Sequence, residues 1–241
     1  MKRKIILKLI PIYILVLSGI FVLSAACSWI IESVSTMSYE DQRHIVIIDA
    51  GHGGIDGGAT SCTGILESTI NLEIALRLND MMRLFGIRTQ MIRDSDISVY
   101  TEGETIAQKK VSDLKERVRI VNQASNGILI SIHQNIFSED KYWGMQAFYA
   151  KTEGSKQLAE RIQDSIRSAL SPDNHRIAKR SERVYLMENV LCPAVLVECG
   201  FLSNPSEEAK LRDPTYQKEL CSLFACVFSQ YLSDSNEIPI L

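Results

Sequence analysis

The sequence predicts an α/β protein: a single domain built on one twisted, mostly parallel sheet with helices on both faces. Short apolar runs rich in β-branched residues alternate along the chain with longer segments of helical periodicity. The apolar runs are nearly continuous in hydrophobic character, as is typical of strands that are covered on both sides. Strands that alternate with helices in this way form βαβ units, in which right-handed crossovers join parallel strands.

The first βαβ unit occupies the region after about residue 43. A strand is expected at 44–49, directly before a glycine-rich loop that contains His52. Apolar residues with helical spacing predict a helix over 67–85, and Gly86 stands where a C-cap glycine belongs. Residues 88–92 then form the second strand, parallel to the first.

The rest of the chain repeats this alternation. A polar stretch from Arg93 to about Lys110 precedes a helix through Leu114 and Val121, and a strand follows at 128–133. The remaining elements are expected, in order, as a strand at 144–149, a helix at 155–170, a strand at 194–198 and a helix at about 214–232.

The chain has 241 residues, of which 46% are hydrophobic, and this suffices for one well-buried domain plus an appendage. We expect a catalytic domain at 44–235, a linker at 32–43, and a signal peptide or membrane anchor at 1–31, where basic residues precede an apolar run. Both fates remain open, because small residues at 24–26 suit signal-peptidase cleavage, while the apolar run is also long enough to span a bilayer. Either way the domain lies outside the cytoplasm, secreted or membrane-anchored.

Charge and cysteine content narrow the function further. From Leu9 onward, 22 basic residues face 29 acidic ones, a net charge of −7, and no concentrated basic face predicts nucleic-acid binding. The six cysteines form no CxxC pair, and Cys221 and Cys226 are five residues apart on an expected helix, so they do not face one another. We therefore expect buried free thiols rather than disulfides.

Three residues with metal-binding or acid–base chemistry fall at the ends of predicted strands. His52 follows the first strand, His133 ends the 128–133 strand, and Glu198 ends the 194–198 strand. The carboxyl ends of parallel strands meet at one edge of the sheet, where ligands bind. Glu67, at the start of the first helix, can reach the same edge. Each residue alone has a structural explanation, such as a hydrogen-bonded histidine or a glutamate at a helix dipole, so the prediction depends on their convergence.

The chemistry that this set supports is metal-assisted hydrolysis. Two neutral imidazoles and one carboxylate, from His52, His133 and Glu67, leave a Zn²⁺ ion one open position for water. Zinc lowers the pKa of that water from about 15.7 to near 7. Glu198, which is not a ligand in this scheme, would take the proton and pass it to the leaving nitrogen. Histidine and carboxylate ligands also accept other divalent metals.

Four segments, in order along the chain, resemble the motifs of a known family, the zinc-dependent N-acetylmuramoyl-L-alanine amidases. They cover about residues 44–232 and comprise Asp49-Ala-Gly-His52-Gly-Gly-Ile-Asp56-Gly-Gly-Ala59, Glu67 with Asn71-Leu72, Ser131-Ile-His133-Gln-Asn135, and Val197-Glu198-Cys-Gly-Phe201-Leu-Ser-Asn204.

The resemblance implies that His52, Glu67 and His133 bind zinc and that Glu198 is the catalytic glutamate. The implied substrate is peptidoglycan, cleaved between N-acetylmuramic acid and L-alanine. Gln134 and Cys199 depart from the residues usual in the family, but neither change removes a catalytic atom.

Five further residues match recurring family positions, and each is read as structural. Asn135 and Asn204 are expected to shape loops or to support the site from outside it. A role in bridging helix and sheet is favoured over a catalytic one for Arg93, Arg117 and Asn122.

Segment 100–114 is longer than in most of the family and is similar to the corresponding part of spore-cortex amidases, which act in the formation of muramic δ-lactam. This similarity implies a role in spore cortex maturation and germination, in the cortex or intermembrane space of the developing spore. The sequence does not fix the role of the segment itself.

Two other functions remain open at this point. A zinc peptidase acting on the stem peptide would normally carry a His-x-x-Glu pair, but Ile55 stands at the required position after His52. A wall protein that binds zinc but depends on a partner, such as an activator protein of the cell envelope, would keep the same residues. Basic residues at 175–183 either contact the anionic wall or form a solvated loop.

Overall fold

The structure is a computed structural model that describes residues 44–236. The predicted signal or anchor at 1–31 and the predicted linker at 32–43 lie outside the described residues. Within 44–236, no helix combines the length and the apolar character that crossing a bilayer requires.

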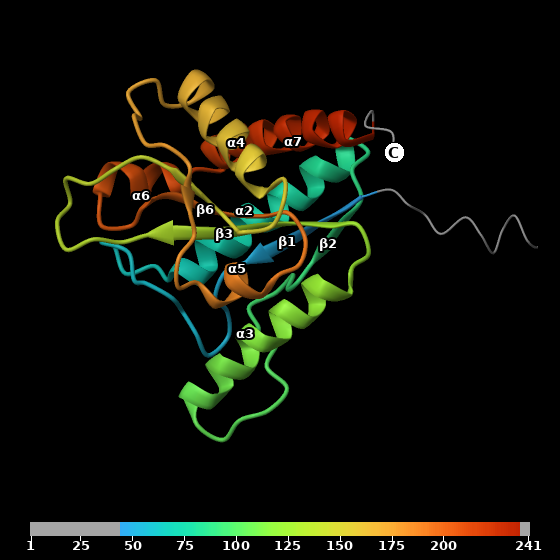
Figure 1. Cartoon of the computed structure of the whole chain (residues 1–241). Helices are drawn as coiled ribbons and strands as arrows, with labels where there is room; N and C mark the ends of the chain where they lie inside the picture. Colours follow the sequence, from blue (N-terminus) through green and yellow to red (C-terminus); the bar gives the residue numbers. More distant parts are fainter. Residues whose placement is uncertain (1–43, 237–241) are drawn as a thin grey trace, which may run out of the picture. The chain divides into compact units, whose positions relative to one another are not determined.

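A six-stranded sheet forms the centre of the domain, and the prediction of an α/β fold with a mostly parallel sheet is confirmed (Figure 1). The strands lie side by side in the order β2 (Thr89–Met91), β1 (Ile45–Ala50), β3 (Gly127–Asn135), β6 (Ala194–Phe201), β4 (Gln146–Tyr149) and β5 (Lys179–Arg180). The first four run parallel, β4 is antiparallel to β6, and β5 is parallel to β4.

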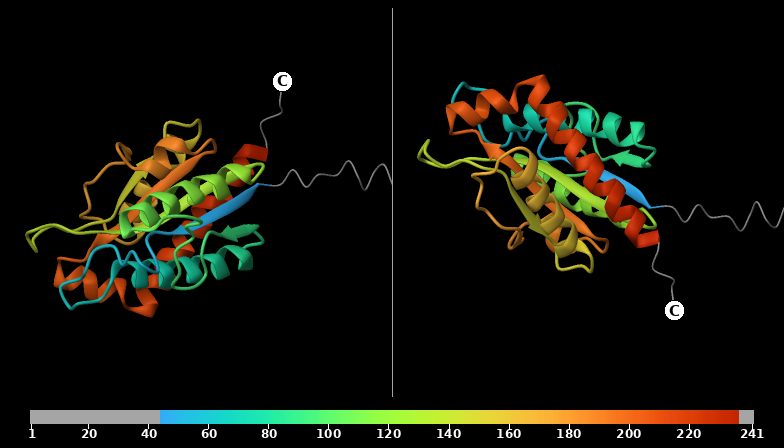
Figure 2. Two further views of the ribbon diagram at one scale, coloured as in Figure 1. Left: turned by 90° about the horizontal axis from the view of Figure 1, so that it is seen from below. Right: turned by 90° about the horizontal axis from the view of Figure 1, so that it is seen from above.

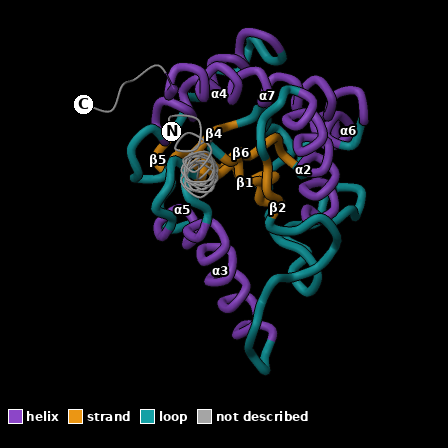
Figure 3. Tube along the Cα trace, turned by 90° about the vertical axis from the view of Figure 1, so that its right-hand side faces the viewer, coloured by secondary structure: helices purple, strands orange, loops and turns teal. Residues whose placement is uncertain are grey.

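Helices cover both faces of this sheet, as Figures 2 and 3 show. One face packs against α2 (Glu67–Leu84), α4 (Ser155–Ala169) and α7 (Pro214–Asn236), which share one large apolar cluster with the inward side chains of β1, β3 and β6. A smaller apolar cluster on the opposite face joins the sheet to α3 (Ile106–Gln123) and α5 (Tyr185–Asn189). The short helix α6 (Pro205–Leu211) packs beside β6 and α7.

The end of α2 follows the predicted glycine cap. Gly86 has a φ of 75°, in the left-handed region that glycine adopts at low cost. Its N–H donates to the Arg83 carbonyl at 3.0 Å, and the Ile87 N–H donates to the Met82 carbonyl at 3.0 Å. This pair of bonds is a Schellman motif, which satisfies carbonyls that the helix itself leaves free.

Helix α3 begins earlier than its polar sequence predicts. The stretch up to Lys110 was expected to be irregular, but the helix starts at Ile106 because Thr105 and Gln108 form a capping box. The Thr105 hydroxyl accepts from the Gln108 N–H at 3.3 Å, and the Gln108 side chain accepts from the Thr105 N–H at 3.0 Å. This T-x-x-Q signature is the signal that the hydrophobic pattern lacks.

All five described cysteines are free, as expected, but burial holds for only two of them. Cys199 and Cys221 are buried, Cys62 and Cys226 are exposed, and Cys192 is intermediate. The expectation of buried thiols is therefore wrong for the exposed pair, because Cys62 lies in the loop between β1 and α2 and Cys226 lies on the outer face of α7.

Candidate active site

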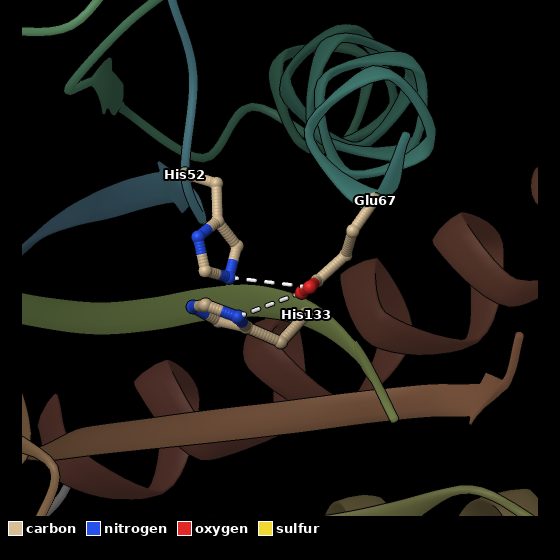
Figure 4. A group of neighbouring side chains, drawn as sticks. All are labelled: His52, Glu67 and His133. Carbon is tan, nitrogen blue, oxygen red and sulfur yellow. Dashed lines mark hydrogen bonds and ion pairs between the residues drawn. The ribbon is translucent and has the colours of Figure 1, made fainter. Parts of the chain in front are cut away.

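Three predicted metal ligands come together at the carboxyl ends of the parallel strands (Figure 4). His52 follows β1, Glu67 is the first residue of α2, and His133 lies near the end of β3. His52 Nε2 lies 3.2 Å from Glu67 Oε2, and His133 Nδ1 lies 3.0 Å from Glu67 Oε1. One ligand atom from each residue lies within 4.8 Å of the other two, so the three could hold a single metal ion.

The chemistry of this donor set fits zinc. Zinc takes nitrogen ligands at about 2.0–2.1 Å, and two imidazoles with one carboxylate are typical of its catalytic sites. Asp56 supports His52 from the outer side, with Oδ2 at 2.9 Å from His52 Nδ1, and Lys110 lies 2.7 Å from the other Asp56 oxygen. A carboxylate only accepts hydrogen bonds, so Nδ1 carries a proton toward Asp56, and Nε2, once deprotonated, would be the atom that binds a metal.

The Glu67 carboxylate is surrounded by donors. Oε2 accepts from the Ala59 N–H at 3.0 Å, and Oε1 accepts from the Gln134 N–H and from Asn71 Nδ2, both at 3.2 Å. Burial works against its charge, but the hydrogen bonds from His133 and His52 outweigh burial and hold the pKa of Glu67 far below its usual value. The group is therefore ionised, as a metal ligand must be.

The His52 imidazole shows the reciprocal effect. Burial alone would lower its pKa, but the carboxylates of Glu67 and Asp56 outweigh burial and raise the pKa to about 9. Two anions thus favour positive charge at this position, which is the electrostatic environment that a cation requires.

Glu198 lies beside this group without joining it. It stands opposite His133 in the register of β3 and β6, so both side chains fall in one row across the sheet. Glu198 Oε2 is buried and has no hydrogen-bond partner among the described residues. Burial, together with the Glu67 charge, raises the pKa of Glu198 despite the opposing effect of the two histidines. A buried carboxyl oxygen without a partner is rare and is typical of a functional group.

The backbone just after β1 has two unusual features, at Gly51 and His52. His52 has a φ of 61°, a left-handed conformation that is uncommon outside glycine, although histidine is among the residues enriched in it. A Cβ atom added to Gly51 would lie 2.3 Å from both Cε1 and Nε2 of His133. Glycine at 51 therefore lets the His133 ring lie directly against the chain.

Changing Gly51→Ala is expected to displace the His133 imidazole and to weaken zinc binding by about 10- to 100-fold, the loss typical of disturbed support around a metal ligand. A titration against a chromophoric chelator measures this. Gly57→Ala is the matched control, since its Cβ would meet only the flexible end of Leu66, at 3.1 Å. Unchanged affinity in a folded Gly51→Ala variant would contradict the argument.

Arg93 and Arg117 bridge helix and sheet, which confirms the structural reading of both. Arg93 donates to the carbonyls of Ala50 at 2.8 Å, Gly51 at 3.1 Å and Ser68 at 2.9 Å, and so ties the end of β1 to the first turn of α2. Its side chain is almost fully buried.

Arg117 connects α3 to the same loop. It forms a buried ion pair with Asp49, and it donates to the carbonyls of Ala50 at 3.0 Å and His52 at 2.7 Å. A second carboxylate, from Asp113, lies 2.6 Å from Arg117 Nε. Ser131 donates to the remaining oxygen of Asp49 at 2.6 Å, so this network is closed.

The asparagines singled out in the sequence also hold elements in place. Asn122 Nδ2 donates to the Asn189 carbonyl at 3.1 Å and so ties α3 to α5. Asn204 caps α6 by accepting from the Ser206 and Glu207 N–H groups, at 3.0 and 3.1 Å. The Asn135 carbonyl accepts from the Leu202 N–H at 2.8 Å. For Asn122 and Asn204 the structural reading is confirmed.

Gln134, the first departure from the family pattern, supports Glu67 through its backbone N–H and donates from its side chain to Asn71 Oδ1 at 3.2 Å. Cys199 is buried on the other side of β6 from the site, within the larger apolar cluster. Neither residue obstructs the candidate metal site.

A cavity of about 380 Å³ opens beside the site, between the sheet and helices α3 and α5. His52 and His133 form part of its wall, and Arg183, Val184, Tyr185 and Leu186 line the side nearest α5. Sequence reasoning missed this wall because α5 has only five residues, too few for a periodic pattern. The only signal was the group of basic residues at 175–183, for which a solvated loop was favoured over contact with the wall.

The fold and the site together define a hydrolase of the α/β class with a place for one metal ion at the strand ends. Residues 46–225 match the N-acetylmuramoyl-L-alanine amidase family. The germination-specific N-acetylmuramoyl-L-alanine amidase of Bacillus subtilis (strain 168) is 38% identical over 197 residues, which span 81% of this chain and 82% of that protein.

Solved structures agree with this match. The CwlD amidase from Clostridioides difficile, in complex with the GerS lipoprotein, has a TM-score of 0.76 at 37% identity, over 80% of this chain and 100% of that one. An N-acetylmuramoyl-L-alanine amidase from Clostridium difficile 630 has a TM-score of 0.69 at 31% identity, over 80% and 98% of the two chains. The chain belongs to the N-acetylmuramoyl-L-alanine amidase family. It hydrolyses the amide bond between N-acetylmuramic acid and L-alanine in peptidoglycan.

Proposed function

We propose that this amidase depends on zinc, that His52, Glu67 and His133 are the metal ligands, and that Glu198 is the catalytic acid–base. The observation that carries the proposal is the juxtaposition of a complete donor set with a buried, unpartnered carboxyl oxygen on the neighbouring strand. Ion pairs that serve only the fold normally leave no such oxygen without a partner.

When bound, zinc supplies Lewis acidity and makes water acidic enough to act as a nucleophile near neutral pH. Glu198 accepts the proton that this water releases and then donates it to the nitrogen of L-alanine, because an amide nitrogen leaves only once it is protonated. Burial raises the pKa of Glu198, which makes the carboxyl group a better base and lets it hold the proton between the two steps. Asp56 keeps the His52 ring oriented throughout.

We further propose that the enzyme acts outside the cytoplasm on the peptidoglycan of the spore cortex, in the maturation that includes muramic δ-lactam. The name of the Bacillus subtilis relative, which specifies germination, supports this role. The capture of the CwlD relative with the GerS lipoprotein supports an envelope partner that assists the enzyme. An N-terminal signal peptide or membrane anchor would deliver the domain to that compartment.

The test is to incubate the purified protein and zinc with peptidoglycan and to identify the released species by mass spectrometry. We expect free stem peptides that begin with L-alanine. Peptides that are shortened but still attached to muramic acid would support a stem peptidase instead. Release that occurs only after a candidate envelope protein is added would establish dependence on a partner.

Metal removal and His133→Ala test the zinc assignment. Chelation is expected to abolish hydrolysis and added zinc to restore it, while His133→Ala is expected to bind zinc at least about 100-fold more weakly, because a ligand is lost rather than a supporting group. Metal content and activity are measured together. The control is His175→Ala, which changes an exposed histidine far along the chain from the three ligands. Full zinc affinity in His133→Ala would refute the assignment.

A further inference from the structure

The cavity beside the candidate metal site has a distinctive lining. Aliphatic side chains form much of its surface, namely Ile55, Leu114, Val184, Leu186 and Leu196. Its polar part includes Asp49, Arg117 and Ser131, which are joined to one another by the closed network described above. The cavity thus offers an apolar surface next to His52 and His133, where the reaction takes place.

The charges that face this cavity are almost all neutralised by neighbours. Asp49 and Asp113 pair with Arg117, and Asp56 pairs with Lys110. The exception is Arg183, whose exposed side chain makes no hydrogen bond or ion pair with any of the described residues. One guanidinium group is therefore available to an anion that enters the cavity.

The backbone at Arg183 is also unusual. Its φ is 67°, and within residues 44–236 only His52 and Asn126 share a positive φ among residues other than glycine. Asparagine and histidine are enriched in this conformation, but arginine seldom adopts it. Arg183 and His52, which shares the positive φ, both line this one cavity. Such conformations cluster at functional sites, where they aim a side chain.

We propose that Arg183 binds a carboxylate of the substrate's stem peptide and that the cavity holds the first residues of that peptide. This inference rests on the proposed function. A volume of about 380 Å³ lies at the small end of ligand pockets, which suits a short peptide segment. Aliphatic walls suit the methyl group of L-alanine, and a guanidinium group binds a carboxylate through two parallel hydrogen bonds.

The chemistry of the substrate favours the peptide over the glycan as the source of the anion. The carboxyl group of N-acetylmuramic acid is consumed in the amide bond that the enzyme cleaves, so the sugar offers none at this point. The carboxyl group of L-alanine is likewise consumed by the next peptide bond. The nearest free carboxylate is the α-carboxyl group of the second residue, one residue further on, and an extended residue spans about 3.3–3.6 Å.

The test compares two soluble substrates in which the γ-carboxyl group of the second residue is blocked, as it is in the stem peptide. One is N-acetylmuramoyl-L-alanyl-γ-D-glutamyl-glycinamide, whose glutamyl α-carboxyl group is free, and the other is its counterpart in which that α-carboxyl group is an amide. The native enzyme is expected to favour the free acid in kcat/KM by about 10- to 100-fold, the range for a hydrogen bond to a charged group. Arg183→Gln is expected to bring the ratio close to one by slowing cleavage of the acid alone. Arg183→Lys should keep part of the preference, because it retains the charge but not the planar pair of donors.

Arg180→Gln is the matched control, since Arg180 is an exposed cation at the end of β5, three residues before Arg183, and does not line the cavity. It should leave the ratio unchanged. Equal rates on both substrates in the native enzyme, or a preference that persists in Arg183→Gln, would overturn the inference while leaving the amidase assignment intact. Failure of the native enzyme to cleave either substrate, with zinc bound, would instead remove the proposed function and this inference with it.

Discussion

Replacing Glu198 with glutamine is expected to lower kcat for amide hydrolysis by about 10²- to 10⁴-fold, the usual contribution of a general acid–base. Glutamine has nearly the same shape but cannot exchange a proton, so the fold and the ligand set remain. Zinc content should therefore be unchanged. The measurement is the rate of release of L-alanine amino groups, made on samples whose metal content has been determined.

Glu160→Gln provides the comparison for this experiment. Glu160 lies exposed on α4, on the far face of the sheet, where its ion pair with Lys156 contributes little. The Glu160→Gln variant should hydrolyse the substrate at the same rate as the native enzyme. A Glu198→Gln variant that retained more than about a tenth of the native rate would have lost less than the roughly 10²-fold that a general acid–base contributes at least. Another group would then have to transfer the proton.

The second large effect concerns stability. Arg117→Ala is expected to lower the free energy of unfolding by about 3–5 kcal/mol, the usual result of removing one partner of a buried ion pair. Asp49 would be left buried and ionised without its cation, and the carbonyls of Ala50 and His52 would lose donors. Urea unfolding followed by circular dichroism measures the change.

The same helix provides the control. Arg119→Ala removes an exposed pair with Glu116, which solvent screens, and should lower the free energy of unfolding far less than Arg117→Ala does. The pH dependence of the free energy of unfolding tests whether the ionised Asp49 carboxylate is the cause of the loss. Arg117 and Ser131 overcome burial and hold the pKa of Asp49 below 3.8, so this stabilisation is present above that pH and is lost as pH falls through the folded-state pKa. Equal losses in Arg117→Ala and Arg119→Ala would refute the argument.

Much of the candidate site follows from the sequence because three of its four residues lie at the ends of predicted strands. A β-branched run fixes the position of the strand, and the parallel order of β1, β3 and β6 then brings His52, His133 and Glu198 to one edge. Glu67 could be placed because it opens a helix of eighteen residues in which Ile70, Ile74 and Leu78 recur at helical spacing.

The cavity wall could not be predicted, because its elements are too short to have a pattern. Helix α5 and strand β5 depend on contacts with α3 and β4, which lie far away in the sequence. The conformation of Arg183 is likewise set by its neighbours, since arginine has no intrinsic preference for a positive φ. The residues next to these positions in the sequence do not reveal contacts with elements that are distant along the chain.

Three successive carbonyl groups, those of Ala50, Gly51 and His52, accept hydrogen bonds from the two buried arginines. The loop that carries His52, the first proposed metal ligand, is thus held in place by α3 and by the segment after β2, independently of any metal. The loop therefore loses its conformational entropy when the chain folds, and not when the ion binds. The affinity of the site for its ion is therefore not reduced by any need to order this loop.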